Sequence, residues 1–345
     1  MRLIDANANR AREGLRVLED YARFVLNAAD LCEALKTIRH DLAAATRDQI
    51  ADAILHRDTP GDVGTQIKTA TESTRADLSD VVTAAGKRLG EALRTVEEYL
   101  KTISPADAAR VESIRYRFYD VEQRLARTLR PAALFANVRL YVLITESACR
   151  ADWFSTAQAA IRGGADCLQL REKNLDAAEL LRRANRFVDL CRRHSVVSII
   201  NDRPDIALLS NADGVHVGQD DLPAIEVRKL IGHTKIVGVS THRVSQARQA
   251  MLDGADYIGV GPIFPSPTKP RDFIAGLDYA KQVSSEIRIP AVAISGITEQ
   301  NMHEVLATGV HAIAVTNAVA GSDDVEAAAR RLKQTLLQAG AERER

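Results

Sequence analysis

The sequence of 345 residues has no net charge at neutral pH, because its 46 basic and 46 acidic side chains cancel. A chain without a global field is not drawn to nucleic acid or to an acidic membrane surface, so we expect neither as a partner. Apolar runs of membrane-spanning length are also lacking, and the N-terminus has no apolar signal segment. We therefore expect a cytoplasmic protein in which any anion site depends on a local cluster of cations.

Cysteine is scarce, and its residues show neither a CxxC pair nor a metal-ligand spacing. The four are Cys32, Cys149, Cys167 and Cys191. Their scarcity fits a reducing compartment. No Ser-His-Asp or Cys-His arrangement for nucleophilic catalysis is apparent either, and no GxGxxG loop follows the first strand-like run.

The first 129 residues have little strand signal and strong helical periodicity. Apolar side chains recur at helical spacing in four stretches, and a Ser104-Pro105 pair provides a start for the fourth. The stretches are Leu15–Val25, Leu31–Leu42, Val82–Leu100 and Val111–Leu125. This periodicity predicts an all-α domain over residues 1–129.

A sequence repeat relates the two halves of this helical domain. The segment Glu13–Arg23 matches Glu91–Lys101, and Thr37–Leu42 matches Ser113–Phe118 more loosely at nearly the same offset. Two similar helical hairpins packed about a pseudo-twofold axis predict a four-helix bundle.

Two features of the helical domain are candidates for a site. The first is a helix face that carries Arg12, Arg16, Glu19 and Arg23. This face is either a solvated set of salt bridges or part of a site, and the residues alone leave both interpretations open. The second is the loop that contains Asp58, Gly61, Asp62 and Gly64. Gly and Asp are also ordinary turn residues.

The pattern changes after Arg130-Pro131 and a short connector. Strand-like apolar runs then alternate with amphipathic helical segments: RLYVLI, ADCLQL, VVSIIN, GVHV, KIVGVS, DYIGVG, PAVAIS and HAIAVT. Eight such units in about two hundred residues predict a (β/α)₈ TIM barrel over residues 130–345, with a doubly wound open sheet as the alternative. The expected fold class is therefore α/β, a barrel preceded by an all-α helical bundle.

Barrel enzymes place their active sites at the carboxyl ends of the strands. The second strand leads into QLREK, in which Gln169, Arg171 and Lys173 point the same way because side chains alternate along a strand. A planar amide, a guanidinium and an ammonium suit a flat heterocycle that carries an oligophosphate. The alternative is that these residues are ordinary solvated charges at a strand end and have no binding role.

Acidic residues follow the next two strands. Asp202 comes after the third strand and Asp221 after the fourth, and such a pair suits Mg²⁺, which takes one or two carboxylates plus phosphate and water. Arg171, Lys173 and Lys269 could then surround a diphosphate leaving group. A second anion site is expected at Gly296 and the turn after strand eight. Two anion sites indicate two phosphorylated substrates that are joined with loss of diphosphate.

Two histidines lie near strand ends. His216 in GVHV is either a satisfied histidine at the mouth of the barrel or a direct substrate contact, and His242 is expected to be structural. The loop 261–272 between the sixth strand and the next helix is rich in Pro and Gly, which favours a lid that becomes ordered when substrate binds.

Six motifs, in order QLREK, NDR, GVHVGQDD, GVSTH, GVGPIFPSPTK and SGI, make residues 138–339 similar to the thiamine phosphate synthase family. The resemblance implies a transferase of thiamine biosynthesis. Its expected reaction joins 4-amino-2-methyl-5-(diphosphooxymethyl)pyrimidine to thiazole phosphate carboxylate, giving thiamine phosphate and diphosphate by a dissociative substitution. Mg²⁺ is the implied cofactor.

The resemblance also implies roles for individual residues. The pyrimidine diphosphate would be bound by Gln169, Leu170, Arg171, Glu172, Lys173, Asn201, His216, Ser240 and Lys269. Those with catalytic roles would be Arg171, Lys173, Ser240 and Lys269. The Mg²⁺ ligands would be Asp202 and Asp221. The thiazole phosphate would be bound by Ser266, Thr268, Gly296, Thr316 and Asn317. Because the sequence departs from the family pattern at Ser266 and at 316–317, backbone and side-chain binding both remain open there.

The segment Asp5–Phe24, together with the Asp62-Val63-Gly64 loop, resembles the helical domain that precedes some thiamine phosphate synthases. That resemblance implies phosphorylation of hydroxymethylpyrimidine phosphate, with ATP as a partner, although no Walker-type glycine loop occurs in the domain. Three alternatives stay open: a thiazole tautomerase-like isomerase, a non-enzymatic phosphate-binding protein, and a bundle that only mediates homo-oligomerisation.

Overall fold

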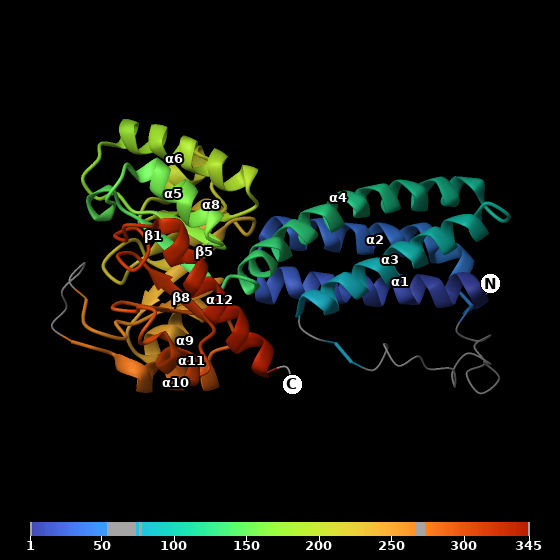
Figure 1. Ribbon diagram of the computed structural model, residues 1–345. Helices are drawn as coiled ribbons and strands as arrows, with labels where there is room; N and C mark the ends of the chain where they lie inside the picture. Colours follow the sequence, from blue (N-terminus) through green and yellow to red (C-terminus); the bar gives the residue numbers. More distant parts are fainter. Residues whose placement is uncertain (1, 54–73, 76–77, 267–272, 344–345) are drawn as a thin grey trace. The chain divides into compact units, whose positions relative to one another are not determined.

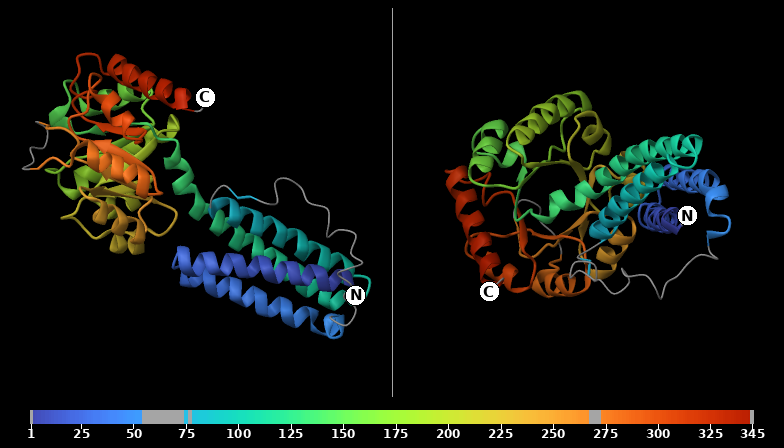
Figure 2. Two further views of the ribbon diagram at one scale, coloured as in Figure 1. Left: turned by 90° about the horizontal axis from the view of Figure 1, so that it is seen from below. Right: turned by 90° about the vertical axis from the view of Figure 1, so that its right-hand side faces the viewer.

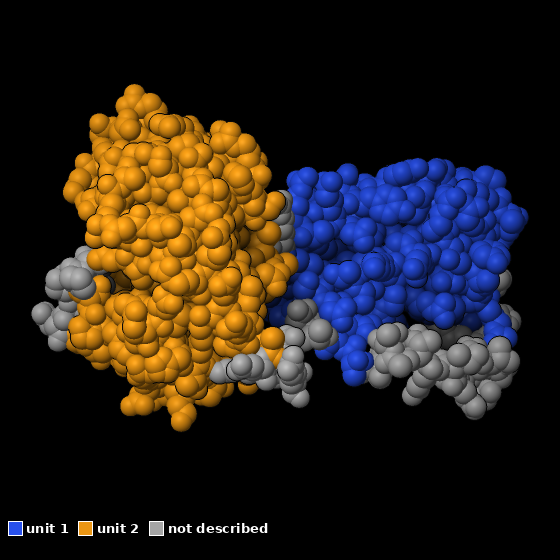
Figure 3. All heavy atoms as spheres, in the orientation of Figure 1, with its two compact units in different colours: residues 1–129 blue, residues 130–345 orange. Residues whose placement is uncertain are grey.

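The computed structural model describes residues 2–53, 74–75, 78–266 and 273–343 (Figure 1). Contacts along the chain divide it into two compact units, Met1–Leu129 and Arg130–Arg345 (Figure 3). No helix in the described ranges combines the length and the apolar character that a membrane span requires.

The first unit consists of long helices packed side by side (Figure 1). They are α1 (Arg2–Asp20), the short π-helix η1 (Tyr21–Val25), α2 (Ala29–Ile50), α3 (Leu78–Leu100) and α4 (Pro105–Ala136). Helix α1 approaches α3 closely at Gly14, where an added Cβ would lie 3.1 Å from the Leu89 Cβ. The apolar stripes meet in one core, with Leu15, Leu18 and Leu93 fully buried. The prediction of an all-α domain is confirmed.

The sequence repeat is also a structural repeat. In the first half the Arg39 Nε donates to Glu19 Oε2 over 3.0 Å, and in the second half the Arg115 Nε donates to Glu97 Oε2 over 2.7 Å. Both glutamates are buried, at 7% and 0% exposure. Glu19 is therefore not part of a merely solvated face, because its carboxylate is held between helices.

Glu97 carries the more strongly paired of the two carboxylates. Burial acts to raise its pKa, but hydrogen bonds from Arg115 and Lys101 outweigh burial and lower the pKa. Arg94 adds a third cation, with its Nη1 at 2.7 Å from the Glu97 Oε1. Glu97 is thus ionised at neutral pH and joins α3 to α4.

One detail of the sequence interpretation was wrong. The sequence suggested a connector after Pro131, but α4 continues through this proline to Ala136. Within a helix a proline removes one hydrogen bond and crowds the carbonyl four residues earlier, yet here the helix continues past it.

The second unit is a closed parallel barrel with strand order β1 to β8. The strands are β1 (Leu140–Ile144), β2 (Cys167–Leu170), β3 (Val197–Asn201), β4 (Gly214–Val217), β5 (Ile236–Thr241), β6 (Tyr257–Val260), β7 (Ala291–Ile294) and β8 (Ala312–Val315). The 3₁₀ turn η4 (Glu146–Ala148) follows β1. In the right-hand view of Figure 2 the helices of this unit form a ring around the strands. The predicted (β/α)₈ fold is confirmed.

The helices of this unit cover the outside of the barrel. They are α5 (Trp153–Arg162), α6 (Ala177–Arg193), α7 (Pro204–Leu209), α8 (Ala224–Ile231), α9 (Val244–Leu252), α10 (Gly276–Glu286), α11 (Met302–Ala307) and α12 (Val325–Arg343). Asp152 and Asp176 cap α5 and α6, since each carboxylate accepts backbone N–H bonds at the start of its helix.

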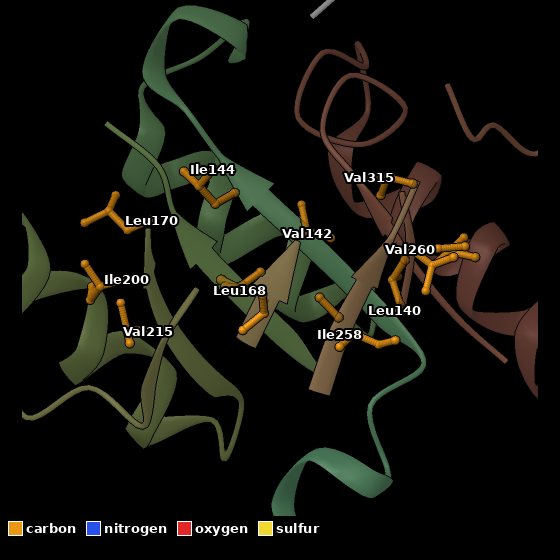
Figure 4. Close-up of a cluster of buried hydrophobic side chains, with 14 of the residues drawn as sticks. Leu140, Val142, Ile144, Leu168, Leu170, Ile200, Val215, Ile258, Val260 and Val315 are labelled. Atoms are coloured by element: carbon orange, nitrogen blue, oxygen red, sulfur yellow. The ribbon is translucent and has the colours of Figure 1, made fainter. Parts of the chain in front are cut away.

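Side-chain alternation along the strands creates two cores. Leu140, Val142, Leu168 and Leu170 face outward against the helices (Figure 4). Their neighbours on the same strands face the barrel interior, where they form a second cluster. Its aromatic members are Tyr141 and Tyr257 from the strands and Phe135 from the end of α4. Several residues of this inner cluster form the floor of the cavity at the strand ends.

Candidate active site

A cavity of about 410 Å³ opens where the barrel strands end. Most of the residues that the sequence proposed for a site line this cavity. They are Gln169, Arg171, Lys173, Asn201, Asp202, His216, Asp221, Ser240, Ser266, Gly296, Thr316 and Asn317. The structure thus brings together side chains from β2, β3, β4, β5 and the loops after β6, β7 and β8.

Two expected site residues lie elsewhere. The Leu170 side chain is 1% exposed and belongs to the outer core between barrel and helices. The Glu172 carboxylate accepts a hydrogen bond from Arg183 Nη1 and another from the backbone N–H of Glu146. Both placements follow from the alternation of side chains along the strand, because the neighbours Gln169, Arg171 and Lys173 point toward the cavity.

Some expectations fall on residues outside the described ranges. These are Thr268 and Lys269 with most of the proposed lid, and the loop with Asp58, Gly61, Asp62 and Gly64.

Opposite charges meet on one wall of the cavity. Lys173 Nζ lies 3.2 Å from the Asp202 Oδ2, while Asp221 receives the backbone N–H of Gly218 on its Oδ2 at 2.8 Å. Burial raises the pKa of Asp202, the neighbouring Asp221 carboxyl raises it further, and Lys173 opposes both. The wall therefore holds two carboxylates, and Asp221 disfavours the charge of Asp202.

This carboxylate pair fits a hard divalent cation. A cation between two carboxylates would remove the repulsion that raises the pKa of Asp202. Among the described residues no group of three or more His, Cys, Asp or Glu side chains could hold a metal ion. Asp202 and Asp221 alone would leave further positions for phosphate oxygens and water, which is the coordination typical of Mg²⁺.

Backbone geometry shapes the opposite wall, after β7. Ser295 and Gly296 have positive φ angles of 85° and 67°, so the chain turns sharply there. A Cβ on Gly296 would lie 2.4 Å from the carbonyl oxygen of Pro265, which excludes any side chain. The Ser295 hydroxyl donates to the Phe264 carbonyl over 3.0 Å. The loops after β6 and β7 are thereby joined, and their backbone faces the cavity beside Ser266.

His216 occupies the centre of the site. Its Nδ1 lies 2.9 Å from the Tyr257 hydroxyl and its Nε2 lies 2.8 Å from the Ser240 hydroxyl. Burial lowers the pKa of His216 to about 4, against an opposing effect of the Asp221 charge. The imidazole is therefore neutral at pH 7, with both nitrogens in hydrogen bonds.

Sequence reasoning missed several cavity residues. Tyr141 and Tyr257 line the cavity but lie within β1 and β6, whereas the sequence signal marks polar residues at the strand ends. Strand alternation could have placed both side chains in the barrel interior. His242, which the sequence predicts to be structural, also lines the cavity. Its Nδ1 lies 2.6 Å from the Gly261 carbonyl oxygen, a contact that holds the start of the loop between β6 and α10.

Fold and site together define the class of protein: a barrel enzyme whose strand ends gather cations and carboxylates round a cavity with an aromatic and aliphatic floor. The family model described as thiamine monophosphate synthase matches residues 140–319, and the model of the ThiD2 family matches residues 2–124.

Comparison with individual proteins points to the same family. A thiamine-phosphate synthase of Rhodopirellula baltica is 43% identical, covering 97% of this chain and 92% of its own length. One of Synechocystis sp. is 39% identical over 92% of this chain and 91% of its own. The structure of thiamine phosphate pyrophosphorylase from Pyrococcus furiosus matches with a TM-score of 0.55 and 33% identity, covering 61% of this chain and 98% of that chain. The chain belongs to the thiamine-phosphate synthase family, whose members are transferases of thiamine biosynthesis.

Proposed function

We propose that the barrel joins 4-amino-2-methyl-5-(diphosphooxymethyl)pyrimidine to thiazole phosphate carboxylate, giving thiamine phosphate, diphosphate and carbon dioxide. The observation that carries this proposal is the division of one cavity into a charged wall and a second wall of turning backbone. Lys173, Asp202 and Asp221 form the first wall, and Gly296 lies in the second. Two walls of this kind suit two phosphorylated substrates held side by side.

The residues of the charged wall would act on the leaving group. Arg171 and Lys173 would hold the diphosphate. Negative charge develops on the diphosphate when the bond between its oxygen and the pyrimidine methylene breaks, and the two cations would stabilise that charge. When bound between Asp202 and Asp221, Mg²⁺ would supply further stabilisation of that charge. The thiazole nitrogen then forms the new bond to the methylene carbon, and the thiazole carboxylate leaves as carbon dioxide, with a proton taking its place on the ring carbon. Bond breaking and bond forming both involve substrate atoms, so the proposed reaction uses no protein nucleophile.

The floor of the cavity would receive the ring systems. Tyr141, Leu143, Val292 and Ile294 present aromatic and aliphatic surface beneath the charged wall. Flat heterocycles bury well on such surface, and excluding water from it would protect the pyrimidine cation from hydrolysis.

The test is release of inorganic diphosphate from the two heterocycles in the presence of Mg²⁺. Lys173→Met should lower kcat/KM by roughly a hundredfold, because a preorganised cation opposite developing charge contributes about that factor. Lys229→Met is the matched control, since Lys229 lies on α8 and pairs with Glu226 at 2.8 Å. Equal activity of both variants would contradict the assignment of Lys173. Isomerisation of a thiazole without diphosphate release would favour a tautomerase instead.

We further propose that residues 1–129 phosphorylate hydroxymethylpyrimidine phosphate with ATP, which would supply the substrate of the barrel. The match of residues 2–124 to the ThiD2 family supports this activity. So does the duplicated pairing of a buried glutamate with an arginine of the next helix, Glu19 with Arg39 and Glu97 with Arg115, which is more order than a spacer needs.

Full-length Asp202→Asn protein offers a clean test of this second activity. It should accumulate pyrimidine diphosphate from the monophosphate and ATP, because the barrel should consume this product roughly a hundredfold more slowly. Absence of ATP-dependent phosphorylation in both this variant and the unmodified protein would leave the bundle an assembly role.

A further inference from the structure

Five side chains form one hydrogen-bonded chain across the floor of the cavity. Gln169 Nε2 donates to the Tyr141 hydroxyl over 2.6 Å, and the Tyr141 and Tyr257 hydroxyl oxygens are 3.0 Å apart. The Tyr257 hydroxyl lies 2.9 Å from His216 Nδ1, and His216 Nε2 lies 2.8 Å from Ser240 Oγ. The chain therefore connects β2, β1, β6, β4 and β5 in the barrel interior.

Proton count and burial together favour one direction for this chain. The reverse direction would leave the unused proton on the buried Tyr141 hydroxyl instead of on Ser240 at the cavity. A hydroxyl has one proton to donate, and a neutral imidazole has one N–H and one acceptor nitrogen. When Tyr141 donates to Tyr257 and Tyr257 donates to His216 Nδ1, every tyrosine proton is used within the chain. His216 then carries its proton on Nε2 and donates to Ser240 Oγ. In this arrangement the Ser240 proton is left for an acceptor in the cavity.

The barrel makes room for this arrangement with glycines. Gly238 on β5 pairs with Tyr257 on β6, and a Cβ at Gly238 would lie 2.1 Å from the Tyr257 Cζ. A Cβ at Gly259 would lie 3.3 Å from His216 Cε1. Any larger residue at position 238 would occupy the space through which the Tyr257 ring reaches His216.

The ring of Phe135 fixes the plane of the Tyr257 ring. Phe135 is 1% exposed, and its ring stacks on that of Tyr257 at 3.7 Å between centroids and 11° between planes. Phe135 also meets the Tyr141 ring edge-on at 6.2 Å. The Tyr257 ring thus stacks on Phe135 and lies against Gly238, and its hydroxyl reaches His216.

From this geometry we propose that Tyr257 is a positioning residue for the synthase reaction: it holds His216 in the Nε2–H tautomer, and His216 in turn presents Ser240 as a hydrogen-bond donor to the pyrimidine diphosphate. The catalytic role of Tyr257 rests on the proposed function of the barrel. Its effect on the His216 tautomer does not depend on that function. Phe135 supports the same arrangement by fixing the tyrosine ring.

The experiment compares Tyr257→Phe with a matched control in the full-length protein. Tyr257→Phe removes one hydroxyl and keeps the stacked ring. Tyr279→Phe removes another buried hydroxyl, which donates to Thr241 Oγ1 over 2.6 Å and lies outside the chain. The first readout is the ¹⁵N spectrum of the His216 ring. The second is kcat/KM and KM for each substrate.

In the wild-type protein and in Tyr279→Phe we expect an unprotonated Nδ1 and a protonated Nε2. In Tyr257→Phe we expect a mixture of tautomers. The kcat/KM for the pyrimidine diphosphate should fall roughly ten- to hundredfold, as for loss of one buried hydrogen bond, while KM for the thiazole phosphate stays unchanged. A variant that merely folded less well would lose activity with both KM values unchanged.

Two results would overturn the proposal: a protonated Nδ1 in the wild-type protein, or a Tyr257→Phe variant with the wild-type tautomer and kinetics. If Tyr257→Phe failed to fold, Phe135→Leu would be used in its place and should produce the same mixture of tautomers. If the wild-type protein released no diphosphate, the proposed function would fail, and the ¹⁵N spectrum would still decide whether Tyr257 sets the His216 tautomer.

Discussion

Replacing Asp202 by asparagine should make the protein more stable and nearly inactive. Burial and the Asp221 carboxyl both raise the pKa of Asp202, so its ionised form is disfavoured in the folded state. Asparagine has the same shape, removes the charge, and tolerates the positive φ of 61° at this position. The partner Lys173 is 48% exposed, so losing the ion pair costs little.

The expected gain in stability is on the order of 1 kcal/mol, as for other substitutions that relieve an unfavourable active-site group. In a unit of this size that corresponds to a rise in Tm of about 2–4 °C, measured without Mg²⁺. Activity should fall by roughly a hundredfold, because the developing diphosphate charge loses stabilisation worth about 3 kcal/mol.

The gain should depend on pH with a definite sign. A carboxyl whose pKa is raised by folding binds its proton more tightly in the folded state, so the wild-type protein gains stability as pH falls. The advantage of Asp202→Asn should be complete above the raised pKa, and should disappear as pH falls toward the ordinary value of 3.8.

Mg²⁺ and a control variant complete the test. Added Mg²⁺ with diphosphate should raise the Tm of the wild-type protein and leave that of Asp202→Asn unchanged, since a ligand stabilises only a state that binds it. Asp205→Asn is the control, because the Arg203 hydrogen bond lowers the pKa of Asp205 and its removal should not stabilise. A fully active Asp202→Asn protein, or one less stable than wild type without Mg²⁺, would refute the reasoning.

Three further predictions concern packing, charge and thiol chemistry. Gly238→Ala should destabilise the barrel by roughly 1–3 kcal/mol in urea unfolding, because the new methyl group meets an aromatic ring at 2.1 Å; an unchanged midpoint would contradict this. Glu97→Gln should cost on the order of 3 kcal/mol, since it leaves the buried Arg115 guanidinium without its counter-charge, and wild-type stability would show that the pair is dispensable. Cys167 and Cys191 should resist a thiol reagent at pH 8 in the folded protein, because burial raises the pKa of both thiols; rapid labelling of either would refute this.

The sequence was sufficient for the fold because both units carry strong periodic patterns. Eight short apolar runs separated by amphipathic segments fit the closed barrel, and the four apolar stripes fit the helices of the first unit. The continuation of α4 beyond Pro131 was not predicted, because a proline at that point reads as a helix boundary.

The site was less accessible to sequence reasoning. Polar residues at strand ends are visible as breaks in apolar runs, and this signal found Lys173 and Asp202. Tyr141 and Tyr257 gave no such signal, because an aromatic residue inside an apolar run looks like ordinary core. The role proposed for Tyr257 depends on hydroxyl positions across the barrel, which only the three-dimensional register of the strands reveals.

The most direct test of the central claim is a product balance for the full-length protein with both heterocyclic substrates and Mg²⁺. The account predicts one inorganic diphosphate released for each thiamine phosphate formed, with both products lost on chelation of the metal. Diphosphate release without thiamine phosphate, or turnover of the thiazole phosphate alone, would contradict it.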